Sequence, residues 1–244
     1  MGLADLHIHT TYSDGMATVS AVLEVASRSE LDVIAITDHD TVAGALEARE
    51  RAGHYGVQVI PGTEITTAEG HLLALFVDRR IPSGRSLVET VLRVADLGGL
   101  CIAPHLLAPW MHSLTPNILR GALELPEVAQ TLVGIEVFNG GLPFLGSNRR
   151  AQAFANQTSL TQLANSDAHL LWTIGLFGSS FPGTSIEQLR RALKGRMMRP
   201  VIQPRPAGYY PSFVKGLLLR RAGLAWTAGP GEDIVLRPLA EGQA

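Results

Sequence analysis

Short apolar runs alternate with longer amphipathic stretches along most of this 244-residue chain. The runs are rich in β-branched and aliphatic residues, and most of them end on polar residues, as buried strands of a parallel sheet do. The predicted strands span residues 3–8, 33–37, 57–65, 71–77, 100–105, 133–139 and 160–169. Apolar residues recur at helical spacing between them, and the predicted helices span residues 18–29, 41–55, 86–97, 148–156 and 185–194.

This alternation predicts an α/β fold with a mostly parallel sheet, and about seven strand–helix units predict a barrel. The barrel domain is expected to span residues 1–198. From residue 199 the pattern weakens into the proline-rich RPVIQPRPAGYYP, a short basic helix at 214–222 and a polar tail. We expect residues 199–244 to form a C-terminal appendage that packs on the barrel and is not an independent domain.

Ionisable side chains gather where the predicted strands end, and in parallel barrels the site lies at the C-terminal ends of the strands. Six of the eight histidines belong to this group, with three carboxylates. The group consists of His7, His9, Asp14, His39, Glu64, His71, His105, Asp167 and His169. His71 is the exception among them, because it precedes its apolar run.

Imidazole and carboxylate together are the ligands that Zn²⁺, Mn²⁺ and Fe accept in proteins. His7 and His9 are two residues apart on a predicted strand, so their side chains point to the same side, and Asp167 and His169 repeat this spacing. A single His-x-His is often incidental. However, an apolar barrel interior has little reason to hold this many titratable groups without cations to compensate them. The pattern therefore predicts a metal centre.

Composition limits the partners and the compartment. Charged residues make up 17% of the chain and the net charge is −2, so there is no basic track for long nucleic acid. The single cysteine, Cys101, cannot form an intrachain disulfide, which fits a reducing compartment. There is no basic-then-apolar leader and no apolar run of about 18 residues. A soluble, cytoplasmic protein with no membrane partner is expected.

Six motifs, in order along the chain, resemble the PHP family, the polymerase-and-histidinol-phosphatase domain. They are DLHIHTTYSDG (5–15), TDHDT (37–41), GTEIT (62–66), APH (103–105), GIEVFNG (134–140) and NSDAH (165–169). The resemblance runs from Asp5 to about Lys194 and is nearest to small stand-alone metal-dependent phosphoesterases. It implies a distorted seven-stranded (β/α) barrel with two or three divalent ions, Mn, Zn or Fe, at the C-terminal ends of the strands.

The resemblance also implies how the ligands are divided among the ions. The first ion would take His7, His9 and Asp167. Glu64 would be shared with a second ion, which His71 and His105 complete. The third ion would take Asp14, His39 and His169. The chain departs from the family at Leu106, where a proline is usual after the histidine, and at Asp14, where some relatives have a histidine.

Further polar residues are expected to support these ligands. Asp5, Asp38 and Asp40 are predicted to accept hydrogen bonds from the ring N–H groups of the histidines and so to orient them. Asp38 and Asp40 are predicted to support catalysis in this way. An N-cap of the next helix is the alternative for Asp40. Glu136 is expected either to face the mouth of the barrel or to accept from a backbone donor. For His112, a position that lines the entrance of the site is the alternative to a position outside it.

These residues predict a metal-dependent phosphoesterase in which a metal-activated hydroxide attacks phosphorus. The expected substrate is a small nucleotide or a similar phosphomonoester, and long nucleic acid is not expected to bind. Two alternatives stay open: a 5'-to-3' exonuclease on short oligonucleotides and a catalytically weak, metal-binding regulatory module. Hydrolysis of C–N bonds with a carboxylated lysine is disfavoured because the chain has lysine only at Lys194 and Lys215, both outside the predicted strands.

Overall fold

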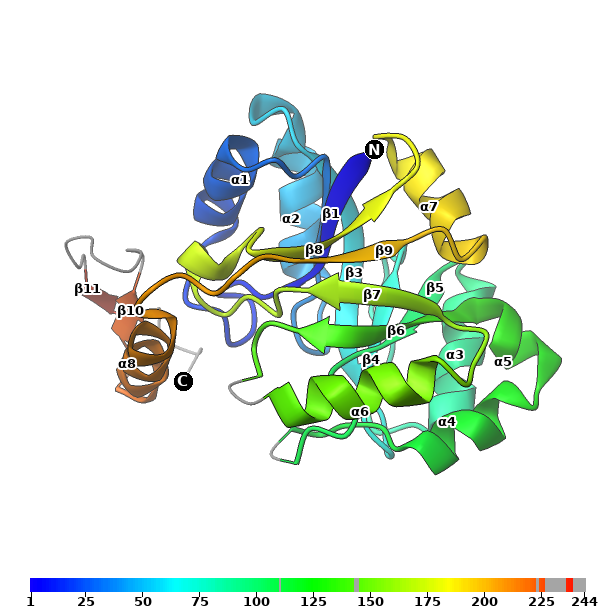
Figure 1. Cartoon of the computed structure of the whole chain (residues 1–244). Coiled ribbons are helices and arrows are strands. Elements are labelled where there is room, and N and C mark those ends of the chain that lie inside the picture. Colours follow the sequence, from blue (N-terminus) through cyan, green and yellow to red (C-terminus); the bar gives the residue numbers. More distant parts are fainter. Residues whose placement is uncertain (110, 143–144, 223, 227–235, 239–244) are drawn as a thin grey trace.

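A computed structural model describes residues 1–109, 111–142, 145–222, 224–226 and 236–238 of the chain. Nine strands form the main sheet in the order β7-β6-β5-β4-β3-β2-β1-β8-β9 (Figure 1). They are β1 (Gly2–Ile8), β2 (Val33–Ile36), β3 (Gln58–Thr66), β4 (His71–Leu75), β5 (Leu100–Ala103), β6 (Leu132–Asn139), β7 (Thr161–Asn165), β8 (Phe177–Phe181) and β9 (Arg199–Ile202).

The expected count of seven strands is wrong, because β8 and β9 extend the sheet beyond β1. Their sequences, FGSSF and RPVI, are short and contain glycine, serine or proline, which weaken the strand signal. The fold is a mixed α/β barrel rather than a mostly parallel one, since β8 and β9 each pair antiparallel with the preceding strand of the sheet.

The direction of β4 explains the exceptional position of His71. Strands β1, β2 and β3 are parallel to one another, as are β5, β6 and β7, whereas β4 is antiparallel to both β3 and β5. His71 begins β4 and pairs in register with Thr66 at the end of β3. An antiparallel strand therefore brings its first residue to the edge where its neighbours bring their last.

Strands β7 and β8 are not paired through their backbones, and a serine side chain links them instead. Ser179 of β8 donates its hydroxyl proton to the carbonyl of Ala164 in β7 and accepts from the N–H of the same residue, both at 2.9 Å. Both residues are fully buried. The sheet is thus nearly closed.

Helices cover the outside of the barrel (Figure 1). They are α1 (Val19–Arg28), α2 (Ala43–Arg51), α3 (Leu87–Asp96), α4 (Pro116–Leu123), α5 (Pro126–Thr131), α6 (Leu145–Ala155) and α7 (Ile186–Lys194), with 3₁₀ turns at Ala52–His54 and Leu171–Thr173. Thr18, Ser86 and Ser185 cap the first turns of α1, α3 and α7 by accepting backbone N–H groups. Helices α4 and α5 had not been predicted.

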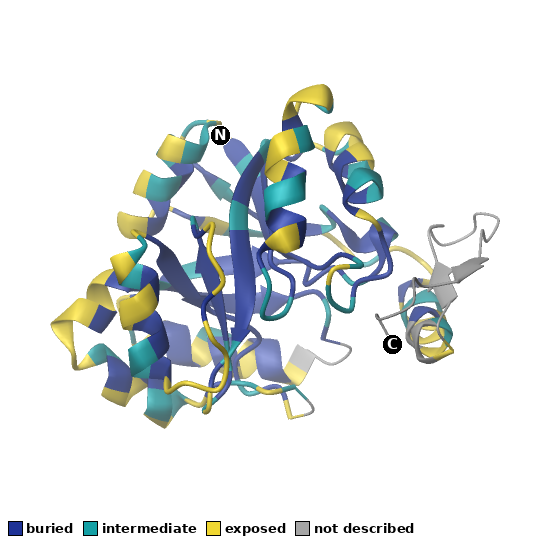
Figure 2. Ribbon diagram, turned by 180° about the vertical axis from the view of Figure 1, so that it is seen from behind, coloured by how far each residue is buried: buried dark blue, intermediate teal, exposed yellow. Residues whose placement is uncertain are grey.

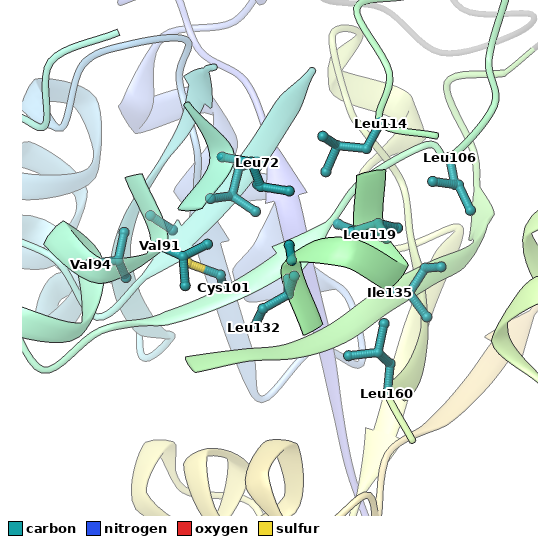
Figure 3. Packing of buried hydrophobic residues seen from close by; sticks show 14 of the residues in the cluster. Leu72, Val91, Val94, Cys101, Leu106, Leu114, Leu119, Leu132, Ile135 and Leu160 are labelled. Atoms are coloured by element: carbon teal, nitrogen blue, oxygen red, sulfur yellow. The ribbon is translucent and has the colours of Figure 1, made fainter. Parts of the chain in front are cut away.

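Three apolar clusters account for most of the core. One packs α1 and α2 on the outer face of β1 and β2, and a second packs α3 to α6 on the other half of the barrel, where Cys101 is buried (Figure 3). The third fills the barrel interior and includes Leu189 and Leu193 of α7. Helix α7 lies at the N-terminal ends of the strands, because Thr161, which begins β7, bonds the carbonyl of Leu193. The interior is therefore apolar at one end and polar at the other.

The chain continues from β9 to helix α8 (Tyr209–Arg221), which lies beyond the C-terminal ends of β6 and β7 (Figure 1). The predicted helix at 214–222 therefore begins five residues earlier. Strands β10 (Leu224–Trp226) and β11 (Leu236–Pro238) pair with each other outside the main sheet. Figure 2 shows the buried strands between helices whose outer faces are exposed. No helix in the described part of the chain is long and apolar enough to cross a membrane.

Candidate metal centre

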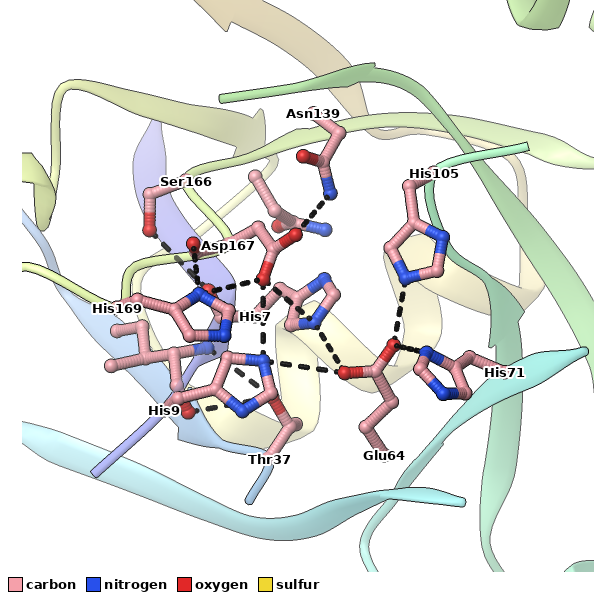
Figure 4. A network of polar contacts seen from close by, with 12 residues as sticks. His7, His9, Thr37, Glu64, His71, His105, Asn139, Ser166, Asp167 and His169 are labelled. Atoms are coloured by element: carbon pink, nitrogen blue, oxygen red, sulfur yellow. Dashed lines mark hydrogen bonds and ion pairs between the residues drawn. The ribbon is translucent and has the colours of Figure 1, made fainter. Parts of the chain in front are cut away.

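The structure brings all nine predicted ligand residues together at the C-terminal end of the barrel, and most of them are visible in Figure 4. Three overlapping groups have side-chain nitrogen and oxygen atoms within 4.8 Å of one another. They are His9, Asp14, His39 and His169; His7, His9 and Glu64; and His39, Glu64 and His71. His7, His9, Glu64, His105 and Asp167 are buried, and the other four are partly buried.

An irregularity in β1 aims the first two histidines at the centre. Leu6 belongs to the cluster inside the barrel, whereas Ile8, two residues later, belongs to the cluster under α1 and α2. On a regular strand these side chains would share a face, but the register of β1 with β2 shifts between Asp5 and Ile8. A bulge re-aims the side chains that follow it. As a result, Leu6 packs inside while His7 and His9 still turn inward.

Glu64 lies in the middle of the cluster, and its two oxygens face different histidines. Oε1 lies 2.8 Å from Nε2 of His105 and 3.1 Å from Nδ1 of His71. Oε2 lies 3.1 Å from Nε2 of His7 and 3.2 Å from Nε2 of His9. A carboxylate with one oxygen toward each group can bridge two cations, which an imidazole cannot do.

The other two carboxylates lie on the His9 side. Oδ1 of Asp167 is 3.3 Å from Nε2 of His7 and 3.2 Å from Nε2 of His9. Oδ2 of Asp14 is 3.1 Å from Nε2 of His169 and 3.7 Å from Nε2 of His39. Asp167 and His105 have positive φ angles of 49° and 26°, so two of the predicted ligand residues are held in backbone conformations that such residues rarely adopt.

The donor atoms fit a metal ion better than they fit one another. Both ring nitrogens of His9, Nδ1 of His71 and Oδ1 of Asp167 are buried without a hydrogen bond of acceptable geometry. Yet Nε2 of His9 is 3.2 Å from oxygens of both Glu64 and Asp167. Lone pairs that converge on a shared point without bonding each other are the arrangement that ligands of one cation adopt.

Without cations, protons compensate the buried carboxylates. Burial lowers the pKa of His9, but Asp167, Glu64 and Asp14 outweigh it and raise that pKa to about 10. The carboxylates raise the pKa of His7 in the same way. Burial raises the pKa values of Glu64 and Asp167, but the surrounding histidines outweigh it and hold both below their usual range. Burial lowers the pKa of His39 to about 4. In the metal-free site, protonated His7 and His9 therefore neutralise carboxylates that cations would otherwise neutralise.

Glu136 holds His7 from outside the cluster. Its Oε1 lies 2.9 Å from Nδ1 of His7, so Nε2 of that ring is directed at Glu64 and Asp167. Its Oε2 accepts from the backbone N–H of His105 at 2.8 Å. The amide groups of Asn139 and Asn165 also donate to this carboxylate, each at 2.8 Å. Metal-binding histidines commonly have such a carboxylate on the other ring nitrogen.

Glu136 is not one of the predicted ligand residues, and the sequence predicts no role for Asn139 or Asn165. The signal for Glu136 is a carboxylate inside the apolar strand GIEVFNG. Of its two expected roles, the structure shows the second: Glu136 accepts from the backbone N–H of His105, and it also contacts the ring of His7. Asn139 and Asn165 end β6 and β7 and pair in register, which places both amides beside Glu136. An asparagine after a strand is also typical of a turn, so the sequence does not single it out.

The expected contacts of Asp38 and Asp40 with imidazole rings are wrong. Asp38 accepts from the N–H and hydroxyl of Thr10, and from the hydroxyl of Ser13, all at 2.7 Å. Asp40 accepts from the N–H of Thr66 at 2.8 Å and does not cap α2, whose N-cap is Val42. Asp38 therefore positions the loop that carries the predicted ligand Asp14, and Asp40 holds the end of β3.

Asp5 has a similar role, and its expected contact with an imidazole is also wrong. It accepts from the N–H groups of Ser166 and Gly175 at 3.1 and 3.2 Å, which positions the loop of Asp167. Burial raises the pKa of Asp5 to about 6.

A cavity of about 440 Å³ opens beside the cluster and is lined by Asp14, His39, Glu64, His71, Asp167 and His169 on one side. His112 lines it as well, and its ring centroid lies 5.5 Å from that of His71. His54 is exposed outside the site. Cavities of this size hold small molecules in other proteins.

Residues 5–176 match the model of the PHP domain family. An uncharacterized protein of Methanocaldococcus jannaschii is 37% identical over 147 residues, which cover 56% of this chain and 81% of that protein. A phosphoribosyl 1,2-cyclic phosphate 1,2-diphosphodiesterase of Eggerthella lenta is 38% identical over 96 residues, 37% of each chain. A 5'-3' exoribonuclease of Salmonella typhimurium is 35% identical over 127 residues, which cover 50% of this chain and 42% of that enzyme.

The fold is similar to that of solved structures. One is a two-domain protein of Bacteroides vulgatus containing a predicted PHP-like metal-dependent phosphoesterase, with a TM-score of 0.69 and 20% sequence identity. The match covers 96% of this chain and 74% of that one. With the family model matching most of the chain, and the nine histidine and carboxylate side chains gathered at one end of the barrel, the chain belongs to the PHP family.

Proposed function

We propose that this chain is a hydrolase of phosphoester bonds that acts on small nucleotides or similar phosphomonoesters with divalent ions bound at the centre. The observation that carries the proposal is the set of buried His9, His71 and Asp167 atoms that lie close to opposite charges without hydrogen bonds. Relatives named as a cyclic phosphate diphosphodiesterase and as a 5'-3' exoribonuclease support phosphoester hydrolysis as the reaction.

We assign the ligands to separate ions according to which histidines each oxygen of Glu64 faces. We assign His7, His9 and Asp167 to one ion and His71 and His105 to a second, with Glu64 between them. Asp14, His39 and His169 remain for a third ion. Two or three ions are therefore expected, and Mn, Zn and Fe are the candidates. When bound, such ions activate water and neutralise charge on a phosphate.

The chain's own residues supply orientation and exclude water around the ions. Glu136 keeps Nε2 of His7 directed at the centre, and Ser113, whose Oγ lies 3.0 Å from Nδ1 of His105, does the same for that ring. His7, His9, Glu64 and His105 are all at most 1% exposed, so substrate reaches the ions from the cavity side alone. A buried, prearranged ligand set reduces the reorganisation needed during the reaction.

A 5'-to-3' exonuclease acting on short oligonucleotides is the second candidate, and the similarity to the Salmonella exoribonuclease favours it. Two observations favour the small substrate. The cavity has a volume of about 440 Å³, and none of its described lining residues is a lysine or an arginine. An oligonucleotide would place further phosphates along the site, which basic side chains usually neutralise.

The proposal is tested with purified protein, Mn²⁺ and a panel of p-nitrophenyl phosphate, nucleoside monophosphates and short oligonucleotides. Hydrolysis should require the ion, be lost on chelation and be abolished by His7→Ala. His54→Ala is the matched control, because His54 is exposed outside the cluster, and it should retain full activity. Activity that survives both chelation and His7→Ala would refute the proposal, and elemental analysis of the same samples measures the number and identity of the ions.

We also propose that residues 199–244 extend the barrel domain and do not fold as a separate unit. Strand β9 belongs to the main sheet, and the hydroxyl of Tyr209 donates to the carbonyl of Gly140 at 2.7 Å. A chain truncated after residue 198 should therefore lose thermal stability, which a melting curve measures.

A further inference from the structure

The cavity beside the metal centre has two chemically different sides. Its polar lining comes from the ligand residues and from His112. Its remaining described lining is apolar or glycine and includes Met16, Met111, Leu142, Leu170 and Phe213. A substrate therefore meets charged groups at one end and an apolar wall at the other.

The aromatic part of this wall comes from the C-terminal segment. Phe213 lies on α8 and packs with Met16, Leu170 and Trp172, which are brought there by other parts of the chain. It is partly exposed and lines the cavity. Helix α8 lies beyond the C-terminal ends of β6 and β7 (Figure 1), and its residues Phe213 and Gly216 line the cavity beside the cluster. The wall is thus built from segments that are far apart in the sequence.

Hydrogen bonds hold this wall close to a ligand residue. Tyr209, one turn before Phe213, donates its hydroxyl to the carbonyl of Gly140 at 2.7 Å, and Arg205 donates to the carbonyl of Leu142 at 3.1 Å. The loop that accepts these bonds touches the metal centre, because a Cβ on Gly141 would lie 2.9 Å from Oδ2 of Asp167. The position of Phe213 relative to the ions is therefore defined by the fold.

A glycine allows α8 to approach the barrel this closely. A Cβ on Gly216 would meet both methyl groups of Leu170 at 2.6 Å. Residues three positions apart on a helix lie on the same face, so Phe213 and Gly216 both face the cavity. Gly216 lets the helix contact Leu170, and Phe213 fills the space next to it.

We infer that this site selects phosphomonoesters whose alcohol carries one flat, uncharged, apolar group, which packs against Phe213 while the phosphate lies at the ions. The inference rests on the proposed function and specifies its substrate class. Ring burial against an aromatic and aliphatic wall stabilises such a ligand. A second phosphate would face Met16, Leu142 and Leu170 and would lack the cationic donors that compensate phosphate charge. Singly phosphorylated aromatic or nucleoside esters are therefore preferred to bisphosphorylated ones.

Binding is measured first, with analogues that are not hydrolysed. The full chain loaded with Mn²⁺ is titrated by calorimetry with benzylphosphonate and with ethylphosphonate, which carry the same charged group. Benzylphosphonate should bind at least about tenfold more tightly, as expected for burial of a ring. Equal affinities, or tighter binding of ethylphosphonate, would overturn the inference.

The role of Phe213 is tested by substitution at neighbouring positions of one helix. Phe213→Ala should lower the affinity for benzylphosphonate about tenfold more than that for ethylphosphonate, and Phe213→Leu should have a smaller effect. Val214→Ala is the control, because Val214 is 54% exposed and does not line the cavity. An equal loss for both phosphonates in Phe213→Ala and Phe213→Leu would overturn the role of Phe213.

Hydrolysis separates this inference from the function on which it rests. kcat/KM is compared for benzyl phosphate and ethyl phosphate, and for adenosine 5'-monophosphate and adenosine 3',5'-bisphosphate. A preference for the first member of each pair supports the inference, and a preference for the bisphosphate overturns it. If no ester is hydrolysed, the proposed function fails, while the phosphonate affinities still decide whether the apolar wall selects flat ligands.

Discussion

Nδ1 of His7 lies 2.9 Å from Oε1 of Glu136, and both side chains are fully buried. The same carboxylate accepts from two asparagine amides and from the backbone N–H of His105. One residue therefore orients a ligand of each of the two ions that we place on either side of Glu64. The proposed centre therefore depends on a residue that is not itself one of the proposed ligands.

Replacing Glu136 by glutamine should weaken metal binding. A glutamine has one acceptor oxygen where the structure needs two, and its NH₂ group would face donors such as the N–H of His105. Loss of such a partner typically lowers metal affinity by about 10–100-fold. Titration of Mn²⁺ into the metal-free variant measures this. Glu127→Gln, the same change on an exposed residue of α5, should leave the affinity unchanged, and equal affinity in all three proteins would contradict the assigned role.

The metal-free protein should lose stability as the pH rises from 6.5 toward 10. The pKa of His9 is raised from 6.5 in the unfolded chain to about 10, so its stabilising contribution is complete below pH 6.5 and disappears as the pH rises through 10. His39 acts in a different window. Its pKa is lowered to about 4, so its stabilising contribution is complete above pH 6.5 and is lost as the pH falls toward 4. The combined stabilising contribution of His9 and His39 is therefore largest near pH 6.5.

Urea unfolding in the presence of a chelator measures this dependence at pH 6.5 and at pH 9.5. The free energy of unfolding should be lower at pH 9.5, and the drop should be smaller in His9→Ala. Since an ion takes the place of the proton, metal uptake should release protons and apparent metal affinity should rise over the same interval. A metal-free protein that is equally stable at both pH values would show that His9 is not protonated in this way.

Much of the site can be predicted from the sequence because most of its ionisable residues lie near or just after the ends of apolar runs. Eight of the nine predicted ligand residues lie near or shortly after the end of an apolar run, so the edge of the sheet can be inferred from the pattern. His71 shows the limit. Its place before an apolar run was visible, but the antiparallel direction of β4 depends on pairing with β3 and β5, which no local pattern specifies.

The missed features depend on contacts between distant segments. Strand β8 is short and contains glycine and serine, and it forms because its backbone pairs antiparallel with β1 and β9, which are distant in the sequence. Asp38 is predicted to orient an imidazole, but in the structure it accepts from Thr10 and Ser13 instead. Local sequence identifies a functional carboxylate, whereas its partner depends on the tertiary fold.

Gly44→Ala should disturb the loop that carries His9 and Asp14, although alanine favours helices. A Cβ at Gly44 would collide with Oδ2 of Asp38, whose oxygens hold Thr10 and Ser13 of that loop. Metal affinity should therefore fall even if the helix itself gains stability. Gly53→Ala is the matched control, because a Cβ there meets nothing within 4 Å. Unchanged metal affinity in Gly44→Ala would show that the loop tolerates displacement of Asp38.

Ser179→Ala should destabilise the barrel where its sheet is interrupted. The serine hydroxyl both accepts from the N–H of Ala164 and donates to its carbonyl, at 2.9 Å each, and alanine would leave both backbone groups buried without this partner. A buried polar group without a partner costs about 1–3 kcal/mol, so the free energy of unfolding should fall by at least that amount. Ser180→Ala, on the next residue of β8, should change it by no more than about 0.5 kcal/mol, because Ser180 is only partly buried. Urea denaturation of the three proteins measures these free energies, and equal stabilities would show that the Ser179 hydroxyl does not stabilise the contact between β7 and β8.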